Sequence, residues 1–251
     1  MKTIEEVLGK LDEVILWSKE NKSPLGYFAC TYRATTEQVL RNVQLKKFED
    51  NQRMVRMDVH FALRYIDAWE AYQKEKKCTN SWYLAFEAAK NDKLLILHHV
   101  FLGMNAHINL DLGISAAAVM PYRKINPLKN DFGRINSVIA SINQSVQEKL
   151  GDIFYPVELL DELTNGRDNA MLDFAISKAR DASWTTAVIN SNTPKFLRES
   201  LIDIVDYATA KVATQILKPK WTDSKTISRL RSCENQDVVK NIEILQAIKN
   251  V

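Results

Sequence analysis

The sequence predicts an all-α fold, a multi-helix bundle packed around one buried central helix at about residues 93–120. Three observations support this. Apolar residues recur at three- and four-residue spacing along most of the chain, only seven glycines and six prolines occur, and no stretch shows the alternation of a β-strand. The segment Lys93–Met120 is the most apolar. Since a surface helix keeps a polar stripe, we expect the other helices to enclose this one.

The elements before the central helix follow from their start signals and apolar spacing. We predict helices at about 3–21 (capped by Thr3), from Thr35 or Thr36 to Leu45, at 51–76, and from Thr79, Asn80 or Ser81 to about residue 91. Thr3 and Glu6 form a capping-box pattern, and Ser23-Pro24-Leu25-Gly26 is expected to end the first helix.

After Pro121 the pattern predicts a loop to about Lys129 and then further helices. Their expected ranges are about 130–151, 156–163, 168–189 and 194–217, with one or two shorter helices around 227–230 and 238–248. We expect residues 1–218 to form a single all-α domain. The more polar residues 219–251 are expected to form a helical C-terminal extension, either a lid or a dimer arm.

Composition limits the class of protein. A net charge of +3, from 34 basic and 31 acidic residues, gives no reason to expect a nucleic-acid partner. Three widely spaced cysteines favour reduced thiols, and the N-terminus lacks the apolar core of a signal peptide, so we expect a cytoplasmic protein. Histidines, asparagines and an aspartate within the apolar central segment would be costly in lipid, so stable membrane insertion is not expected.

Polar residues within the central helix are the first candidates for a functional site. At about 100° per residue, His99, His107 and Asp111 drift across one face, whereas Asn105 and Asn109 lie on roughly the opposite face. One pocket could use both sets only if the helix breaks near a glycine, Gly103 or Gly113. His107 and Asp111 are one turn apart and could share a metal ion or a hydrogen bond, whereas His99 lies about 12 Å from His107.

Two kinds of site on His107 and Asp111 are compatible with this spacing. One is a metal or general-base centre completed by Asp58, Asp131, His99 or His60, holding at most one or two divalent ions such as Zn, Fe or Mn. The other is metal-free, with Asp111 orienting the imidazole so that its other nitrogen serves as a base. A buried polar network that only fixes helix packing explains the same residues, and the spacing does not decide between these.

Arg64 and Arg180 lie near inward faces, together with Tyr65, Trp82 and Trp184. The arginines could bind a carboxylate or phosphate of a substrate, or could neutralise buried aspartates as structural ion pairs. Standard motifs of other enzyme classes are missing. The sequence has no GxGxxG, P-loop, GxSxG, HExxH or CxxC, and no paired Glu-x-x-His elements of di-iron bundles.

The segment Asn105–Leu112 (NAHINLDL) resembles an uncharacterised bacterial family of unknown function with a GMNAHINxDL-type motif. The likeness extends over roughly residues 50–215 and includes the motifs DxxFAxRY from Asp58, WxxAF from Trp82, DFxxIN from Asp131 and ARxxxW from Ala179. The resemblance implies no activity. It does imply that one constellation contains Asp58, Arg64, Asn105, His107, Asp111, Asp131, Asn136 and Arg180.

A fainter likeness links His107-x-x-x-Asp111 to the zinc-dependent phospholipase C group, but the second such step is missing and only four histidines occur. A full trinuclear zinc site is therefore not expected. A terpene-synthase function has less support, because no DDxxD segment is present.

These observations favour an enzyme that acts on a small molecule, with a metal-dependent ester or phosphoester hydrolase as the leading hypothesis. The expected catalytic residues are His107, Asp111, Asp58 and Asp131, the expected metal ligands are His107, Asp111 and His99, and the expected substrate-binding residues are Asn105, Asn136, Arg64 and Arg180. The alternative is a non-catalytic helical module that binds an apolar or isoprenoid-like ligand and uses the polar cluster for structure. A homodimer is compatible with either function.

Overall fold

The computed structural model describes residues 1–120, 125–153, 168–218 and 224–248, without the side chains of 140–144, 147, 168–177 and 224. Helices joined by turns and short loops make up these residues, and no β-strand occurs among them. The predicted all-α class is therefore confirmed.

The first two helices show one confirmed cap and one wrong boundary. Helix α1 spans Ile4–Glu20, and the Thr3 hydroxyl accepts a hydrogen bond from the Glu6 N–H at 3.2 Å, as predicted. Helix α2 spans Leu25–Gln44 and so begins about ten residues before the predicted start. Thr35 does not cap a helix, because its hydroxyl donates to the Thr31 carbonyl at 3.0 Å in the middle of α2.

Helices α3 (Asn51–Gln73) and α4 (Asn80–Glu87, continued by the 3₁₀ turn η1, Ala88–Lys90) agree with the predicted ranges. The cap of α4 comes from elsewhere in the chain. The Asp206 carboxylate accepts the backbone N–H groups of Asn80 at 2.7 Å and Ser81 at 2.9 Å. A carboxylate suits this position because it satisfies free N–H groups and complements the helix dipole.

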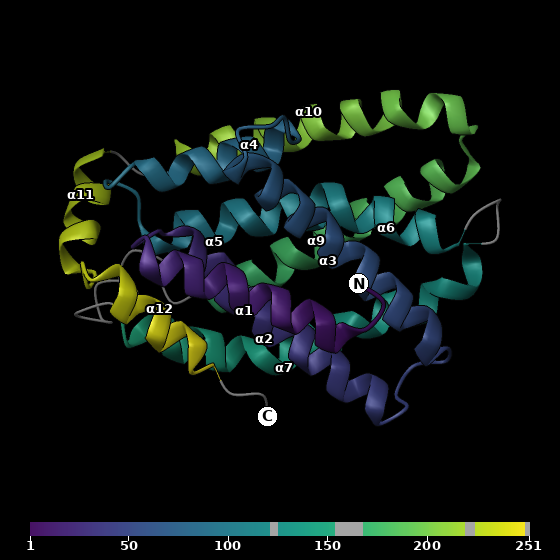
Figure 1. Cartoon of the computed structure of the whole chain (residues 1–251), viewed down its shortest axis with the longest axis horizontal. Helices are drawn as coiled ribbons and strands as arrows, with labels where there is room; N and C mark the ends of the chain where they lie inside the picture. The colour runs from purple at the N-terminus through teal and green to yellow at the C-terminus, as the bar shows by residue number, and fades with distance from the viewer. Residues whose placement is uncertain (121–124, 154–167, 219–223, 249–251) are drawn as a thin grey trace.

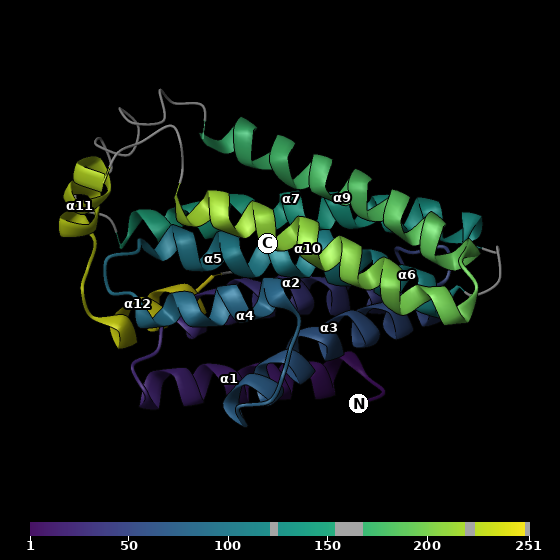
Figure 2. The same cartoon turned by 90° about the horizontal axis from the view of Figure 1, so that it is seen from above.

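The central segment is a continuous helical rod with an irregular middle. It consists of α5 (Ile96–Asn105), the π-helical stretch η2 (Ala106–Asp111) and α6 (Leu112–Val119). Figures 1 and 2 show this rod inside the bundle, with α1 and α3 on one side and α9 on the other. Leu102, Ala106 and Leu110 are fully buried, which confirms the expected enclosure.

Neither central glycine breaks the rod, so the condition under which one pocket could use both faces of this segment is not met. A Cβ at Gly103 would clash with the ring of Phe28, and a Cβ at Gly113 would lie 2.7 Å from the carbonyl oxygen of Ser183. Both glycines therefore allow neighbouring helices to approach closely. The departure from α-helical geometry falls between them, at η2.

The remaining helices complete the bundle around the rod. They are η3 (Asn126–Leu128), α7 (Lys129–Gly151), α9 (Asp168–Asn192), η4 (Lys195–Leu197), α10 (Arg198–Leu217), α11 (Ser224–Cys233) and α12 (Val238–Gln246). The predicted helix at 156–163 lies outside the described residues. α9 packs along α6, and α10 packs against α4, α5 and η2.

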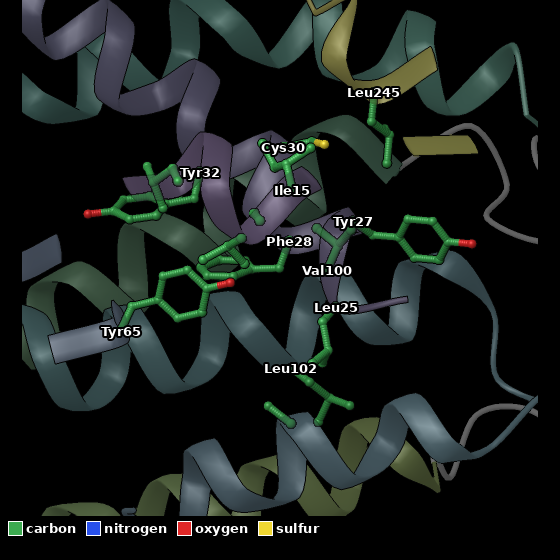
Figure 3. Close-up of a cluster of buried hydrophobic side chains, with 14 of the residues drawn as sticks. Ile15, Leu25, Tyr27, Phe28, Cys30, Tyr32, Tyr65, Val100, Leu102 and Leu245 are labelled. Carbon is green, nitrogen blue, oxygen red and sulfur yellow. The ribbon is translucent and has the colours of Figure 1, made fainter. Parts of the chain in front are cut away.

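The main core forms where α2 meets α1, α3, α4 and α5. Figure 3 shows the rings of Phe28, Tyr32 and Tyr65 gathered at its centre. Leu245 of α12 belongs to the same core and is fully buried, so the last helix packs onto α2. The predicted domain boundary at residue 218 stays a prediction. No helix in the described part of the chain combines the length and hydropathy needed to cross a bilayer.

Candidate functional site

The centre of the candidate site is the pair His107 and Asp111 on η2. The Nδ1 atom of His107 lies 3.2 Å from Oδ2 of Asp111, and both side chains are almost completely buried. π-Helical turns are rare in proteins as a whole, but those that occur are often found at functional sites. The predicted hydrogen bond between these residues is therefore present, on a distorted turn that the spacing alone did not indicate.

Asp111 is held by donors from two other helices. Its Oδ1 accepts from Nε of Arg64 on α3 at 2.9 Å, and its Oδ2 accepts from Nε1 of Trp82 on α4 at 2.8 Å. With His107, three donors converge on one carboxylate. Nothing in the sequence spacing of Trp82 indicates that its N–H reaches Asp111.

Aromatic rings surround the imidazole of His107. Phe61 stacks flat on it, with 3.5 Å between ring centroids, and Tyr32 meets it edge-on at 4.4 Å. Phe28, Trp82 and Tyr65 follow at 5.9, 5.9 and 6.2 Å. Phe28 and Tyr32 come from α2, 79 and 75 residues earlier in the chain, and no motif in the sequence connected them with His107.

Burial lowers the pKa of His107 below its usual 6.5 and outweighs the opposing effect of Asp111. The imidazole is therefore neutral at pH 7. Because Nδ1 faces an acceptor, it carries the proton, and Nε2 keeps its lone pair. Nε2 is buried and has no hydrogen-bond partner in the described structure. A buried polar atom without a partner is uncommon and often marks a place for water or a ligand.

Asp58 of α3 is a second buried group without a full set of partners. Its Oδ2 lacks a hydrogen bond, and burial raises its pKa to about 7. After burial, the charge of Asp58 is the largest factor that raises the pKa of Tyr32, whose ring touches His107. Asp58 therefore lies within electrostatic reach of the ring that borders His107.

Phe61, which stacks on His107, and Arg64, which binds Asp111, lie between these two residues and the solvent. Both are only partly buried, and 26% of the Arg64 side chain is exposed. His60, on the same helix, lies 3.2 Å through Nδ1 from the hydroxyl of Ser115, and no hydrogen bond described here joins it to His107 or Asp111. Movement of Phe61 or Arg64 is thus the shortest way to open the imidazole to a small molecule.

The Phe61→Ala substitution is expected to raise the pKa of His107 towards 6.5, because the imidazole then loses the ring that shields it from water. The measurement is a histidine NMR titration of the folded variant. Phe196→Ala is the control, because Phe196 is 81% exposed and does not touch His107. An unchanged pKa of His107 in Phe61→Ala would contradict the role of Phe61 as its cover.

Asp131 belongs to a separate structural cluster. It accepts the backbone N–H of Glu49 at 2.7 Å and of Asp50 at 3.0 Å, and Nη2 of Arg53 at 2.8 Å. Burial alone would raise its pKa, but these hydrogen bonds outweigh it and the pKa lies below its usual value. Arg53, which binds Asp131, and Arg64, which binds Asp111, are eleven residues apart on α3. The two clusters are therefore separated by about 16 Å along the axis of α3.

Arg180 and Asn136 form a third cluster between α9 and α7. Nε of Arg180 donates to Oδ1 of Asn136, Nη2 donates to the Phe132 carbonyl at 2.6 Å, and the guanidinium lies 4.7 Å from the centre of the Phe132 ring. Burial lowers the pKa of Arg180 to about 10. Asn105, the last residue of α5, ties that helix to α10 by donating to the Thr209 carbonyl at 3.0 Å.

The predicted constellation is therefore divided. Arg64 joins His107 and Asp111, and Asp58 lies near them, whereas Asp131, Asn136, Arg180 and Asn105 hold helices together elsewhere. Each of these side chains forms a hydrogen bond with a residue of another helix, and the sequence pattern does not reveal these partners. The nearest additional wall residues for a site are Tyr32, Phe61 and Trp82.

The described residues do not form the predicted metal site. No three His, Cys, Asp or Glu side chains among them are placed to hold an ion. Asp111 is already occupied by N–H donors, one of them cationic. His99 lies against Tyr27, with 5.9 Å between ring centroids, and burial lowers its pKa to about 3. A site for Zn, Fe or Mn on His107, Asp111 and His99 is thus not supported.

Fold and site together define an all-α bundle with a histidine and aspartate pair buried among aromatic rings. Residues 4–219 match the family described as Family of unknown function (DUF5995), and the chain belongs to this family. This confirms the resemblance to an uncharacterised family. Comparisons with curated proteins and with solved structures gave no match.

Proposed function

We propose that the protein is a metal-free acid–base enzyme that hydrolyses an ester of a small, largely apolar molecule at His107. The observation that carries the proposal is the unpartnered Nε2 of a neutral imidazole whose Nδ1 faces Asp111. A histidine oriented in this way by a carboxylate can accept a proton. The surrounding rings favour an apolar, uncharged substrate over a phosphoester.

In the proposed reaction, Nε2 takes a proton from a water molecule while the water oxygen bonds to the acyl carbon. The imidazolium formed is stabilised by Asp111, which remains paired with Arg64. When the bond between the acyl carbon and the alkoxide oxygen breaks, the proton passes from Nε2 to the alkoxide. The products are a carboxylic acid and an alcohol, and His107 returns to its neutral form. Protonated Asp58 would donate a hydrogen bond to the acyl oxygen.

A non-catalytic module that binds an apolar ligand is the second candidate. The observation in its favour is the saturation of Asp111 by three donors in a closed cluster. A cavity beside these rings, lined by Phe28, Tyr65, Trp82 and His99 among others, has a volume of only about 10 Å³. A ligand would have to part the rings. A homodimer is compatible with both functions.

The test of the proposal is the pH dependence of hydrolysis, measured with a panel of neutral aryl and alkyl esters. The base is the neutral imidazole of His107, whose pKa lies below 6.5. The rate should therefore rise with pH until the pH exceeds the pKa of His107. Because the acid is protonated Asp58, with a pKa of about 7, the rate should fall above neutral pH. The expected kcat/KM profile is a bell with its maximum between these values.

In the Asp58→Asn variant the alkaline limb should disappear, because asparagine does not titrate. No turnover of any ester by the wild type, together with saturable thermal stabilisation by an apolar probe such as a C15 isoprenoid alcohol, would replace the enzyme with the binding module. A rate that keeps rising above pH 8 in the wild type would contradict the role of Asp58.

A further inference from the structure

Helix α10 has its polar and apolar residues in the reverse of the usual arrangement. Its buried residues are Asp206, Thr209 and Ala213, whereas Ile204 is 66% exposed and Tyr207 is 61% exposed. The exposed apolar surface continues into η4, with Phe196 at 81% and Leu197 at 46%. Figures 1 and 2 show α10 along the outside of the bundle. Several large apolar side chains exposed along one element are the kind of surface that marks interaction sites.

The inward polar residues explain why the apolar ones face outward. Asp206 caps α4 through Asn80 and Ser81, and the Thr209 carbonyl accepts a hydrogen bond from Asn105. These contacts fix the rotation of α10 about its axis. With its polar face used to anchor the helix, its other face presents Ile204, Tyr207 and Val212 to solvent.

Charges on this face are arranged symmetrically about Tyr207. Asp203 lies one turn before it and Lys211 one turn after it, each about 6 Å away along the axis. Both are exposed, and Nζ of Lys211 lies 4.5 Å from the centre of the Tyr207 ring. Neither is part of a salt bridge described within the chain. An antiparallel copy of the helix, crossing at Tyr207, would place opposite charges against each other on both sides.

We propose that the exposed face of η4 and α10 is the interface of a homodimer in which two copies of α10 pack antiparallel around a two-fold axis at Tyr207. Asp203 of each copy then pairs with the partner's Lys211, and Ile204 is covered. Such an isologous contact closes after two copies, because the same patch is used on both sides. The dimer does not depend on the proposed hydrolysis.

A second copy fits this face better than a lipid surface. Its charged residues nearly balance, with Lys195, Arg198 and Lys211 against Glu199 and Asp203. Helices that lie on anionic membranes are instead rich in lysine and arginine on their polar face. Arg198 also donates to the Thr193 carbonyl at 3.0 Å, so its side chain is already held within the chain.

The test is sedimentation velocity of the full chain over a range of concentrations, with charge-swap variants. The wild type should be a dimer. Asp203→Lys and Lys211→Asp should each weaken dimerisation at least tenfold, because each places like charges together at two points. The double variant should restore the dimer, since it exchanges the two charges. Asp181→Lys is the control, because this exposed residue lies on α9, and it should leave the dimer unchanged.

Ile204→Glu, at a solvent-exposed position, should give a folded monomer, checked by circular dichroism. A monomeric wild type at the highest soluble concentration would overturn the proposal. So would a dimer that persists in Ile204→Glu, or a double charge swap that fails to rescue. Binding of the monomeric wild type to vesicles of anionic phospholipid would assign this face to a membrane and also overturn the dimer.

Discussion

Replacing Asp111 by alanine is expected to lower the free energy of unfolding by about 3–5 kcal/mol, the usual cost of removing one partner from a buried ion pair. The Arg64 cation loses its carboxylate, and two buried donors, Nε1 of Trp82 and Nδ1 of His107, lose their acceptor. Domains of this kind have about 5–15 kcal/mol of total stability, so this loss is large.

The measurement for Asp111→Ala is urea-induced unfolding followed by circular dichroism. Asp181→Ala is the matched control, because it removes an exposed aspartate from a helix surface and should change stability by less than about 0.5 kcal/mol. If Asp111→Ala destabilises the protein no more than the control does, the three hydrogen bonds to Asp111 do not hold α3, α4 and η2 together.

Replacing His107 by glutamine is expected to lower kcat/KM for the hydrolysed ester by about 100- to 10,000-fold, the range for loss of a positioned general base. Glutamine can still donate an N–H to Asp111, so the packing around η2 should be kept. Its side chain cannot accept a proton at neutral pH. The loss should therefore appear mainly in kcat while the fold remains intact.

His60→Gln is the control for this experiment, because His60 is a second histidine on the neighbouring helix α3, only partly buried, and its Nδ1 faces the hydroxyl of Ser115 rather than Asp111. It should retain activity within a few-fold of the wild type. Equal activity of His107→Gln and wild type would remove His107 from the reaction. Equal losses in both histidine variants would indicate a general effect on the fold rather than loss of a base.

Local signals in the sequence predicted most of the helices. The cap at Thr3 and the enclosure of the segment around Leu102 follow from short-range spacing. The start of α2 was wrong because Ser23-Pro24-Leu25-Gly26 looked like a terminator with a gap after it. In the structure Pro24 directly precedes α2, and Gly26 lies in close contact with α1 and α12, where a Cβ would be 2.9 Å from Cβ of Ser18 and 2.6 Å from Cδ1 of Ile242.

The site was only partly predictable. His107 and Asp111 were found because they are neighbours on one helix, and Arg64 because it lies near an inward face. The donor Trp82 and the covering rings Tyr32 and Phe61 come from other helices, and their meeting depends on packing. Spacing within one helix carries no information about contacts between helices. For the same reason, spacing could not show that Asp131 and Arg180 lie away from His107 and Asp111.

The most direct test of this account is the protonation state of His107, measured by ¹⁵N NMR of the histidine side chains as a function of pH. We expect a neutral ring at pH 7 with the proton on Nδ1, a pKa below 6.5, and loss of the Nδ1–H preference in Asp111→Asn. A His107 ring that is charged at pH 7, or that carries its proton on Nε2, would contradict a free base at Nε2 and with it the proposed function.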